Sequence, residues 1–553
     1  AQSEQPEPPA VLTGLREPDV LVVAELFSLA IQVGDVIALS GDLGAGKTTF
    51  ARGLIRALMR EGQTSPSSHQ GEVPSPTFTL AQTYHDLRVP ITHFDLYRLG
   101  APEEVDELGL DAAVAQGAAL IEWPENAETH LPPATFVISF CEDGDLRQLE
   151  LIAPGGANDR LKRVCAAFSC LSDAKTHIGD TPRLTHLYGD ASARTYAQID
   201  VRPDAEAGAD TGLGDNGEGG NGPTALLMDW PVQPDGPPVR NGLPYSRIAH
   251  IAEDMPPFLG IADALSRSGF AVPKIYSVDT DAGFMVLEDF GPGVFGALLA
   301  QGAAQEPLWR NALDVLVAMR RVVPPRVLTA PQLSRDVSLP RYDRAALTIE
   351  VELLLDWYWP MVHGAAAPDA VRADFLAAWE APFRVIEAEP DAWVLRDFHS
   401  PNLINRPGQT GLKRTGLIDF QDAVRGPAAY DLVSLLQDAR LDVSEELETE
   451  LMADYLTRAQ RDDPAFDATH FKAVYAAVGA QRCTKILGIF ARLSQRDGKP
   501  KYLAHLPRLW GYLQRNLSHP AGREFAGLAD LATWYDTAFP GHVRRAHHGP
   551  PTA

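Results

Sequence analysis

Two groups of residues in this chain have the types and the spacing that binding and transferring phosphate require. The first is the glycine-rich stretch Gly41-Asp-Leu-Gly-Ala-Gly-Lys-Thr48, and the second consists of Asp397, Asn402 and Asp419. In the first group, glycines let backbone N–H groups approach phosphates, a lysine neutralises them and a threonine hydroxyl can ligate Mg²⁺. In the second, one carboxylate can accept a hydroxyl proton while an Asn and an Asp hold metal ions. We therefore expect two nucleotide sites and two functions.

A strand and a helix must position the glycine-rich stretch. Residues 35–40 form a short apolar run before it, and residues 49–58 place apolar side chains at helical spacing after it. Strand, loop and helix in this order put phosphate at the N-terminus of the helix. The residues expected to bind the nucleotide are Gly41, Asp42, Leu43, Gly44, Ala45, Gly46, Lys47, Thr48 and Thr49.

Two acidic residues further along the chain are candidates for holding a metal ion and positioning water. Asp95 follows residues 92–94, and Glu122 ends the apolar run 118–121. Each alone is more typical of a solvated loop acid, but their order after a phosphate-binding loop favours two carboxylates at strand ends. Asp95 and Glu122 are therefore predicted to be catalytic and, together with Thr48, to bind the metal.

Four motifs in series resemble one protein family. They are Gly41-Asp-Leu-Gly-Ala-Gly-Lys-Thr-Thr49, Val73-Pro-Ser-Pro-Thr-Phe78, His93-Phe-Asp-Leu-Tyr-Arg98 and Ile121-Glu-Trp-Pro-Glu125. In this order they resemble TsaE, the family of small ATPases in bacterial tRNA threonylcarbamoyladenosine synthesis, over residues 11–160. The resemblance implies a compact α/β P-loop domain that hydrolyses ATP with Mg²⁺, works with TsaB- and TsaD-like partners and meets tRNA only indirectly. It also implies a switch-like loop at residues 75–78 and a place for Trp123 near the nucleotide base.

The second group of residues lies in a strand-rich part followed by a helical part. Apolar runs at 187–201 and 225–230 predict two strands, separated by an acidic, glycine-rich insert at 204–222 that we expect to be a disordered hairpin loop. Asp397 and Asn402 follow one apolar strand, and Ile418-Asp-Phe-Gln-Asp422 follows another, which favours kinase chemistry over an ordinary polar loop. His399 is predicted to pack beside this site rather than act as its base. Arg425, Tyr430 and Asp431 are predicted to brace the loop that carries Asp397, here called the catalytic loop.

This part of the chain resembles the aminoglycoside phosphotransferase superfamily and, within it, the AmgK family of cell-wall sugar kinases. The resemblance covers residues 179–540 and rests on Gly189-Asp-Ala-Ser-Ala-Arg-Thr-Tyr196, Leu287-Glu-Asp-Phe-Gly291, Arg396-Asp-Phe-His-Ser-Pro-Asn-Leu403 and Ile418-Asp-Phe-Gln-Asp422. It implies an α+β, two-lobed, protein-kinase-like domain that uses Mg–ATP to phosphorylate N-acetylmuramate or N-acetylglucosamine at the anomeric hydroxyl. It further implies that Ser192 and its loop cover the phosphates, that Glu288 and Phe290 border the adenine, that Asp397 is the catalytic base, and that Asn402 and Asp419 hold metal.

The chain departs from the kinase pattern at two positions. Leu395 stands where kinases usually have a histidine that braces the backbone. The upper-lobe strand at 225–229 lacks the lysine that usually holds the phosphates, and Arg194 is one candidate substitute. Two alternatives stay open: a kinase of an aminoglycoside or another small alcohol, and an interaction module whose nucleotide sites gate partner binding.

Composition sets limits on location and partners. The formal charge of −25 opposes nonspecific binding to nucleic acid or an anionic membrane, and no long uncharged apolar run could span a bilayer. The N-terminal residues do not resemble a secretory signal, so a cytoplasmic location is expected. A linker is expected at 161–178, where the helical pattern decays beyond Leu161, and a disordered tail at 541–553.

Overall fold

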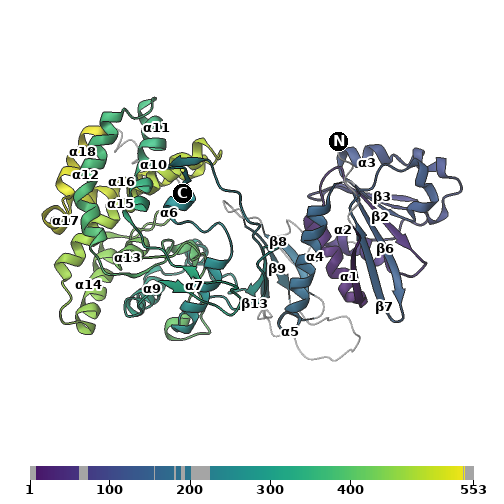
Figure 1. Ribbon diagram of the computed structural model, residues 1–553, viewed down its shortest axis with the longest axis horizontal. Helices are drawn as coiled ribbons and strands as arrows, with labels where there is room; N and C mark the ends of the chain where they lie inside the picture. The colour runs from purple at the N-terminus through teal and green to yellow at the C-terminus, as the bar shows by residue number, and fades with distance from the viewer. Residues whose placement is uncertain are drawn as a thin grey trace. The chain divides into compact units, whose positions relative to one another are not determined.

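The computed structural model describes residues 8–60, 73–154, 156–179, 182–187, 194–200, 224–539 and 541 (Figure 1). Three predictions lie outside these residues: the role of Ser192, the state of the insert at 204–222 and the state of the tail from 542 onward. The chain divides into two compact units. The first comprises Ala1–Pro231 and Lys274–Asp289, and the second Val232–Pro273 and Phe290–Ala553.

The first unit begins with a seven-stranded sheet in the order β1-β7-β6-β2-β5-β4-β3. Its strands are β1 (Ala10–Leu15), β2 (Val36–Gly41), β3 (Ala81–Tyr84), β4 (Ile91–Asp95), β5 (Ala118–Glu122), β6 (Phe136–Asp143) and β7 (Leu146–Ile152). Strand β2 pairs in parallel with β5 and β6, and β5 pairs in parallel with β4. The carboxyl ends of β2, β4 and β5 therefore meet at one edge of the sheet.

Three helices accompany this sheet: α1 (Glu17–Ala30), α2 (Lys47–Arg60) and α3 (Leu110–Gln116). Helix α2 begins directly after the glycine-rich loop, and its apolar face, which includes Phe50, Leu54 and Leu58, is buried. The expected order of strand, phosphate-binding loop and helix is confirmed. Phosphate at this loop would meet the free N–H groups of the first turn of α2.

A second, five-stranded sheet also lies in the first unit, in the order β13-β14-β10-β9-β8. Its strands are β8 (Arg183–Leu187), β9 (Thr195–Asp200), β10 (Thr224–Asp229), β13 (Ile275–Asp279) and β14 (Phe284–Glu288). Strands β9 and β10 pair antiparallel, with Asp200 opposite Thr224. The predicted pair of strands on either side of the insert is confirmed.

The segment between the two sheets is helical, so the expectation that the helical pattern decays beyond Leu161 is wrong. Helix α4 spans Asn158–Asp173, and the short α5 spans Lys175–Ile178. The sequence pattern extends further than expected because the apolar positions 161, 164, 168 and 171 continue at helical spacing, and all four side chains are buried. The predicted domain boundaries themselves stay a prediction.

The second unit is largely helical (Figure 1, green to yellow). Its longer helices are α7 (Pro256–Arg267), α9 (Gln305–Met319), α10 (Arg344–Leu353), α12 (Asp369–Glu387), α13 (Ala429–Leu436), α14 (Glu445–Asp462), α15 (Ala468–Gln495), α16 (Leu506–Ser518) and α18 (Leu528–Ala538). Two small antiparallel pairs join β17 (Ala392–Val394) to β20 (Val424–Gly426) and β18 (Leu403–Asn405) to β19 (Thr415–Leu417). None of the helices in the described part of the chain has the length and the apolar composition that crossing a bilayer requires.

Candidate functional site

Three parallel strands bring the glycine-rich loop and the two predicted acids together. Asp95 is the last residue of β4 and Glu122 the last residue of β5, and the two are directly paired in the sheet register. Glu122 also pairs with Leu39 of β2, two residues before the loop begins. At Gly41 the backbone has a φ of 135°, and an added Cβ would lie 2.5 Å from the carbonyl oxygen of Phe140, so this position requires glycine.

Both predicted acids are buried and are held by hydroxyl groups. Thr48 Oγ1 donates to Glu122 Oε2 at 2.8 Å. Ser75 Oγ and Thr77 Oγ1 donate to Asp95 Oδ2 at 2.8 and 2.9 Å. The expected switch-like segment 75–78 is therefore hydrogen-bonded to Asp95, and Thr48 of the glycine-rich loop is hydrogen-bonded to Glu122.

Lys47 and Trp123 form another wall of the same site. Lys47 Nζ donates to the carbonyl oxygens of Gly41 and Asp42 at 2.6 and 2.8 Å, and it lies 3.6 Å from the centroid of the Trp123 ring. Burial lowers the pKa of the Lys47 ammonium, and the carboxylate of Glu122 is the largest of the charges that oppose this shift. A cation held by loop carbonyls and an aromatic face is available to phosphate oxygens, which would replace those carbonyls as partners.

These side chains surround a cavity of about 270 Å³. It is lined by Leu43, Gly44, Gly46, Lys47, Thr48, Thr49, Ser75, Thr77, Asp95, Tyr97, Glu122 and Trp123. Within the described ranges, no cluster of three or more His, Cys, Asp or Glu residues could hold a metal ion by itself. The hydroxyl and the two carboxylates fit Mg²⁺, because this ion usually takes few protein ligands and completes its shell with phosphate oxygens and water.

Sequence reasoning missed one member of this site, His93. Its Nε2 lies 2.8 Å from Glu122 Oε1, and its side chain is fully buried. A signal was available, because His93 precedes Asp95 by two positions and so lies on the same face of β4. His93 fixes the orientation of Glu122 through the oxygen that Thr48 does not use.

The second candidate site is built by the β18–β19 pair. Asn402 directly precedes β18, and Asp419 lies two residues after β19, so antiparallel pairing returns the chain to the same end. Asn402 Nδ2 donates to the carbonyl oxygen of Asp397 at 3.1 Å and lies 3.4 Å from Asp419 Oδ2. Gln421 Nε2 donates to the other carboxylate oxygen of Asp419 at 3.2 Å. The three residues predicted from their spacing are therefore brought together.

The backbone before Asp397 is braced by buried groups from α13. Arg396 has a φ of 69°, a left-handed conformation that few non-glycine residues adopt. Asp431 accepts hydrogen bonds from the N–H groups of Leu395 and Arg396 at 2.6 and 3.0 Å, and Ser434 Oγ donates to the Arg396 carbonyl oxygen. Asp431 thus braces the catalytic loop as predicted, in a chain that lacks a histidine at position 395. Arg425 instead donates to Asp391 and to the carbonyl oxygen of Leu339, and the Tyr430 hydroxyl lies 3.4 Å from Lys485 Nζ.

The charge state of Asp397 depends on His399. The His399 Nε2 atom lies 3.6 Å from Asp397 Oδ1 and 3.2 Å from an Arg440 nitrogen. Burial alone would raise the pKa of Asp397, but the neighbouring imidazole of His399 and the charges of Lys485 and Arg482 together outweigh it and hold this pKa below its usual range. Asp397 is therefore ionised at neutral pH, as a proton acceptor must be.

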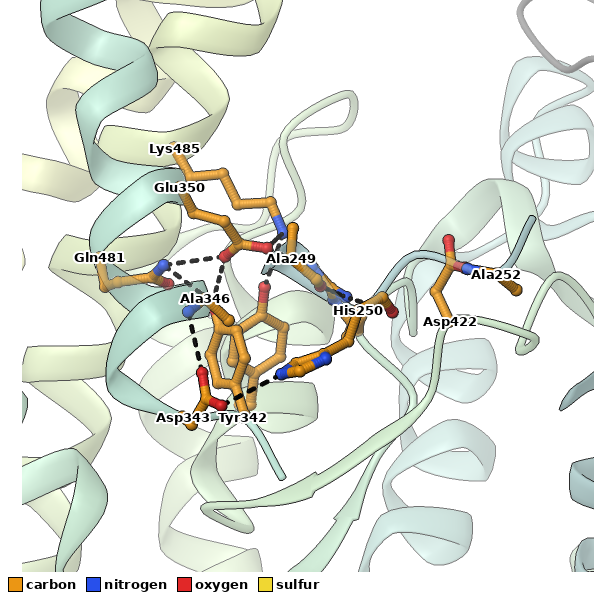
Figure 2. Close-up of polar contacts among 12 residues, drawn as sticks. Ala249, His250, Ala252, Tyr342, Asp343, Ala346, Glu350, Asp422, Gln481 and Lys485 are labelled. Atoms are coloured by element: carbon orange, nitrogen blue, oxygen red, sulfur yellow. Dashed lines mark hydrogen bonds and ion pairs between the residues drawn. The ribbon is translucent and has the colours of Figure 1, made fainter. Parts of the chain in front are cut away.

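A buried carboxylate, Glu350 of α10, connects the catalytic loop to α15 (Figure 2). Lys485 Nζ donates to Glu350 Oε1 at 2.8 Å and Gln481 Nε2 to Oε2 at 3.0 Å. Arg396 and Tyr342 also donate to this carboxylate, and Arg396 donates in addition to the carbonyl oxygen of Ala249 at 2.7 Å. Sequence reasoning missed Glu350, which lies nearly 50 positions before the loop it contacts.

The residues expected near adenine and phosphate are placed as follows. Glu288 ends β14 and accepts a hydrogen bond from the N–H of Lys274 at 3.2 Å. Phe290 packs against Gly416, and the Arg406 guanidinium lies 4.1 Å from its ring centroid. Arg194, the candidate substitute for the lysine, lies 4.9 Å from the centroid of the Trp230 ring. Their nucleotide-binding roles stay predictions.

Comparisons with known proteins relate the two candidate sites to two different families. The family model described as Threonylcarbamoyl adenosine biosynthesis protein TsaE matches residues 17–149, and the one described as Phosphotransferase enzyme family matches residues 245–471. An N-acetylmuramate/N-acetylglucosamine kinase from Caulobacter vibrioides is 38% identical over 377 residues, which are 66% of this chain and 95% of the relative. A tRNA threonylcarbamoyladenosine biosynthesis protein TsaE from Haemophilus influenzae is 38% identical over 145 residues, which are 26% of this chain and 84% of the relative. The chain belongs to both families.

It is thus a fusion of a TsaE domain with a member of the N-acetylmuramate/N-acetylglucosamine kinase family. A second such kinase, from Neisseria meningitidis, is 35% identical over 267 residues, 47% of this chain and 73% of the relative. The matches confirm the predicted fold class, a P-loop α/β domain followed by a phosphotransferase domain of the protein-kinase type, and they confirm that the chain is an enzyme. Both families use ATP, typically with Mg²⁺.

Proposed function

We propose that the kinase domain phosphorylates the anomeric hydroxyl of N-acetylmuramate or N-acetylglucosamine at the expense of ATP. The observation that carries this proposal is the convergence of Asp397, Asn402 and Asp419 in a chain related to such kinases along 95% of a relative. The alternatives, a different small-alcohol acceptor or a nucleotide-gated interaction module, have no comparable observation in their favour.

In the proposed transfer, one residue accepts a proton and two residues bind the metal. Asp397, ionised at neutral pH, accepts the hydroxyl proton as the sugar oxygen attacks the γ-phosphorus of ATP. The new O–P bond forms while the bond from the γ-phosphorus to the bridging oxygen breaks, and ADP leaves with that electron pair. Asn402 and Asp419 would hold Mg²⁺, which when bound neutralises charge on the phosphates.

We propose that the P-loop domain binds Mg–ATP in the cavity around Lys47 and hydrolyses it. Thr48, Asp95 and Glu122 would hold the metal and position water, and the ring of Trp123 would pack near the base. TsaB- and TsaD-like proteins would be the partners that use this hydrolysis in tRNA threonylcarbamoyladenosine synthesis, so tRNA is met only indirectly. We place these reactions in the cytoplasm, which contains ATP and tRNA.

The kinase proposal is tested by incubating the purified chain with Mg–ATP and each amino sugar, and identifying products by mass spectrometry and phosphorus NMR. Wild type is expected to form an anomeric phosphate. Asp397→Asn is expected to lower kcat by about 10²- to 10⁴-fold, because that is what a positioned proton acceptor contributes. Asp374→Asn removes an exposed carboxylate of α12 and serves as the matched control.

Two results would count against the proposal. A folded, ATP-binding chain that phosphorylates neither sugar would point to another acceptor. An Asp397→Asn variant as active as Asp374→Asn would remove Asp397 from the chemistry.

A further inference from the structure

One face of the five-stranded sheet is apolar and fully covered. Alternate residues of a strand share a face, and those on this face are each at most 4% exposed: Ala197, Ile199, Ala225, Leu227, Phe284 and Val286. They belong to one hydrophobic core with residues of α1, α2 and α4, inside the first compact unit. The TsaE domain and α4 therefore cover a surface that the kinase sheet would otherwise expose to water.

Helix α4 is attached to both domains by two arginines three positions apart. Arg160 donates to the two carboxylate oxygens of Asp35 at 2.7 and 2.8 Å, directly before β2 and the P-loop. Arg163 pairs with Asp229 at the end of β10 and donates to the carbonyl oxygen of Ala282 at 3.0 Å. Because a bidentate arginine–carboxylate pair fixes orientation as well as distance, α4 holds the strand before the P-loop against the kinase sheet.

Helix α2 makes a second connection. It begins with Lys47 at the phosphate site and ends with Arg60, whose guanidinium lies 2.7 Å from Glu25 Oε1. Glu25 is buried and accepts a hydrogen bond from the N–H of Leu184 in β8. Strand β8 is the edge strand of the five-stranded sheet, in which β14 ends at Glu288, the residue expected to border the kinase adenine. Helix α2 thus connects the first nucleotide site to the sheet that carries a residue expected at the second.

We propose that nucleotide bound at the P-loop changes the activity of the kinase site through α2 and α4. Packed cores and helices pass a displacement on as rigid bodies instead of absorbing it. A shift at Lys47 on nucleotide binding would therefore reach β8 and, through the paired strands of its sheet, β14 and Glu288. Coupling between two sites is reciprocal and typically changes affinity by about 5- to 150-fold. This inference rests on the proposed function, because it takes the kinase site to be active.

The first test measures sugar phosphorylation by the full chain and its Lys47→Ala variant over a range of ATP concentrations. Removing the P-loop lysine is expected to change the kinase kcat/KM for ATP by about 5-fold or more. Arg56→Met alters an exposed residue of the same helix, and this control is expected to behave as wild type. An unchanged kinase kcat/KM in a Lys47→Ala variant that has lost its own ATPase activity would overturn the proposal.

The second test removes the connection instead of the nucleotide site. The double variant Arg60→Met/Arg163→Met loses the pairs with Glu25 and Asp229. In this background the effect of Lys47→Ala on the kinase is expected to fall to within about 2-fold, because the two changes act along one path and are not additive. A Lys47→Ala effect of the same size in both backgrounds would show that these contacts do not carry it.

A third measurement is independent of sugar phosphorylation. In the variant Asn402→Ala/Asp419→Asn the kinase site lacks its predicted metal ligands, so added Mg²⁺ and AMP-PNP report on the P-loop site. Amide hydrogen exchange in β8 is expected to slow, and Lys47→Ala is expected to abolish the slowing. Slower exchange in this variant would support the coupling even if the wild-type chain phosphorylated neither sugar, a result that would contradict the proposed function alone. Unchanged exchange in a chain that binds AMP-PNP would overturn the coupling.

Discussion

In the proposed mechanism Asp397 is the proton acceptor, so the groups that set its pKa also set the acidic limit of kinase activity. Because His399, Lys485 and Arg482 together hold the pKa of Asp397 below its usual range, protonation of Asp397 is expected only in clearly acidic solution. Burial raises the pKa of the neighbouring Asp431 to about 7, although two backbone N–H donors oppose the shift. Any pH dependence near neutrality is therefore expected to come from protonation of Asp431, which braces the catalytic loop, and not from protonation of Asp397.

Replacing His399 with glutamine is expected to raise the pKa of Asp397, because a neutral side chain stabilises the carboxylate less. The acidic limb of the kcat/KM profile should then move to higher pH, while the limb near pH 7 from Asp431 stays in place. The measurement is a pH–rate profile of both proteins. Arg440→Gln, which contacts His399 but has no direct contact with Asp397 among those described, serves as the control. Superimposable profiles for wild type and His399→Gln would contradict this account.

The catalytic loop depends on helices α10 and α15, which meet at Glu350 (Figure 2). The carboxylate of Glu350 is fully buried between the cations of Arg396 and Lys485. Burial alone would raise the pKa of Glu350, but these two cations outweigh it and lower this pKa. Glu350→Gln is expected to cost about 3–5 kcal/mol of unfolding free energy, because it leaves buried cations without a counter-charge.

Denaturant unfolding of the second unit would measure this loss, with kinase activity followed in parallel. Glu380→Gln, which removes an exposed partner of Arg344, is the matched control and should leave the midpoint unchanged. If Glu350→Gln unfolds at the wild-type midpoint, the carboxylate does not hold the loop.

The TsaE domain and α4 cover one apolar face of the five-stranded sheet, so we expect the kinase domain to depend on them for its stability. A fragment of residues 179–541 would expose this apolar face, so it is expected to melt below the full chain and to self-associate. A fragment of residues 158–541 retains α4, which packs on β13 and β14, and should recover part of the loss. Thermal melts and size-exclusion chromatography would measure both effects. A monomeric 179–541 fragment that melts with the full chain would show that the kinase sheet needs no cover.

The motifs and their local elements followed from the sequence because each depends on residues close together in the chain. The glycine-rich loop between β2 and α2, the strands flanking the insert, and the acids ending β4 and β5 are of this kind. Asp397, Asn402 and Asp419 lie within a short segment, so their spacing was also informative.

Contacts between distant parts of the chain did not follow in the same way. Glu350 binds the catalytic loop, His93 orients Glu122, and α4 occupies what the sequence indicated as a linker. Their partners are chosen by three-dimensional packing, which leaves no fixed spacing in the sequence. The shared core of the two domains is the largest case, because an apolar strand face has the same pattern whichever neighbour covers it.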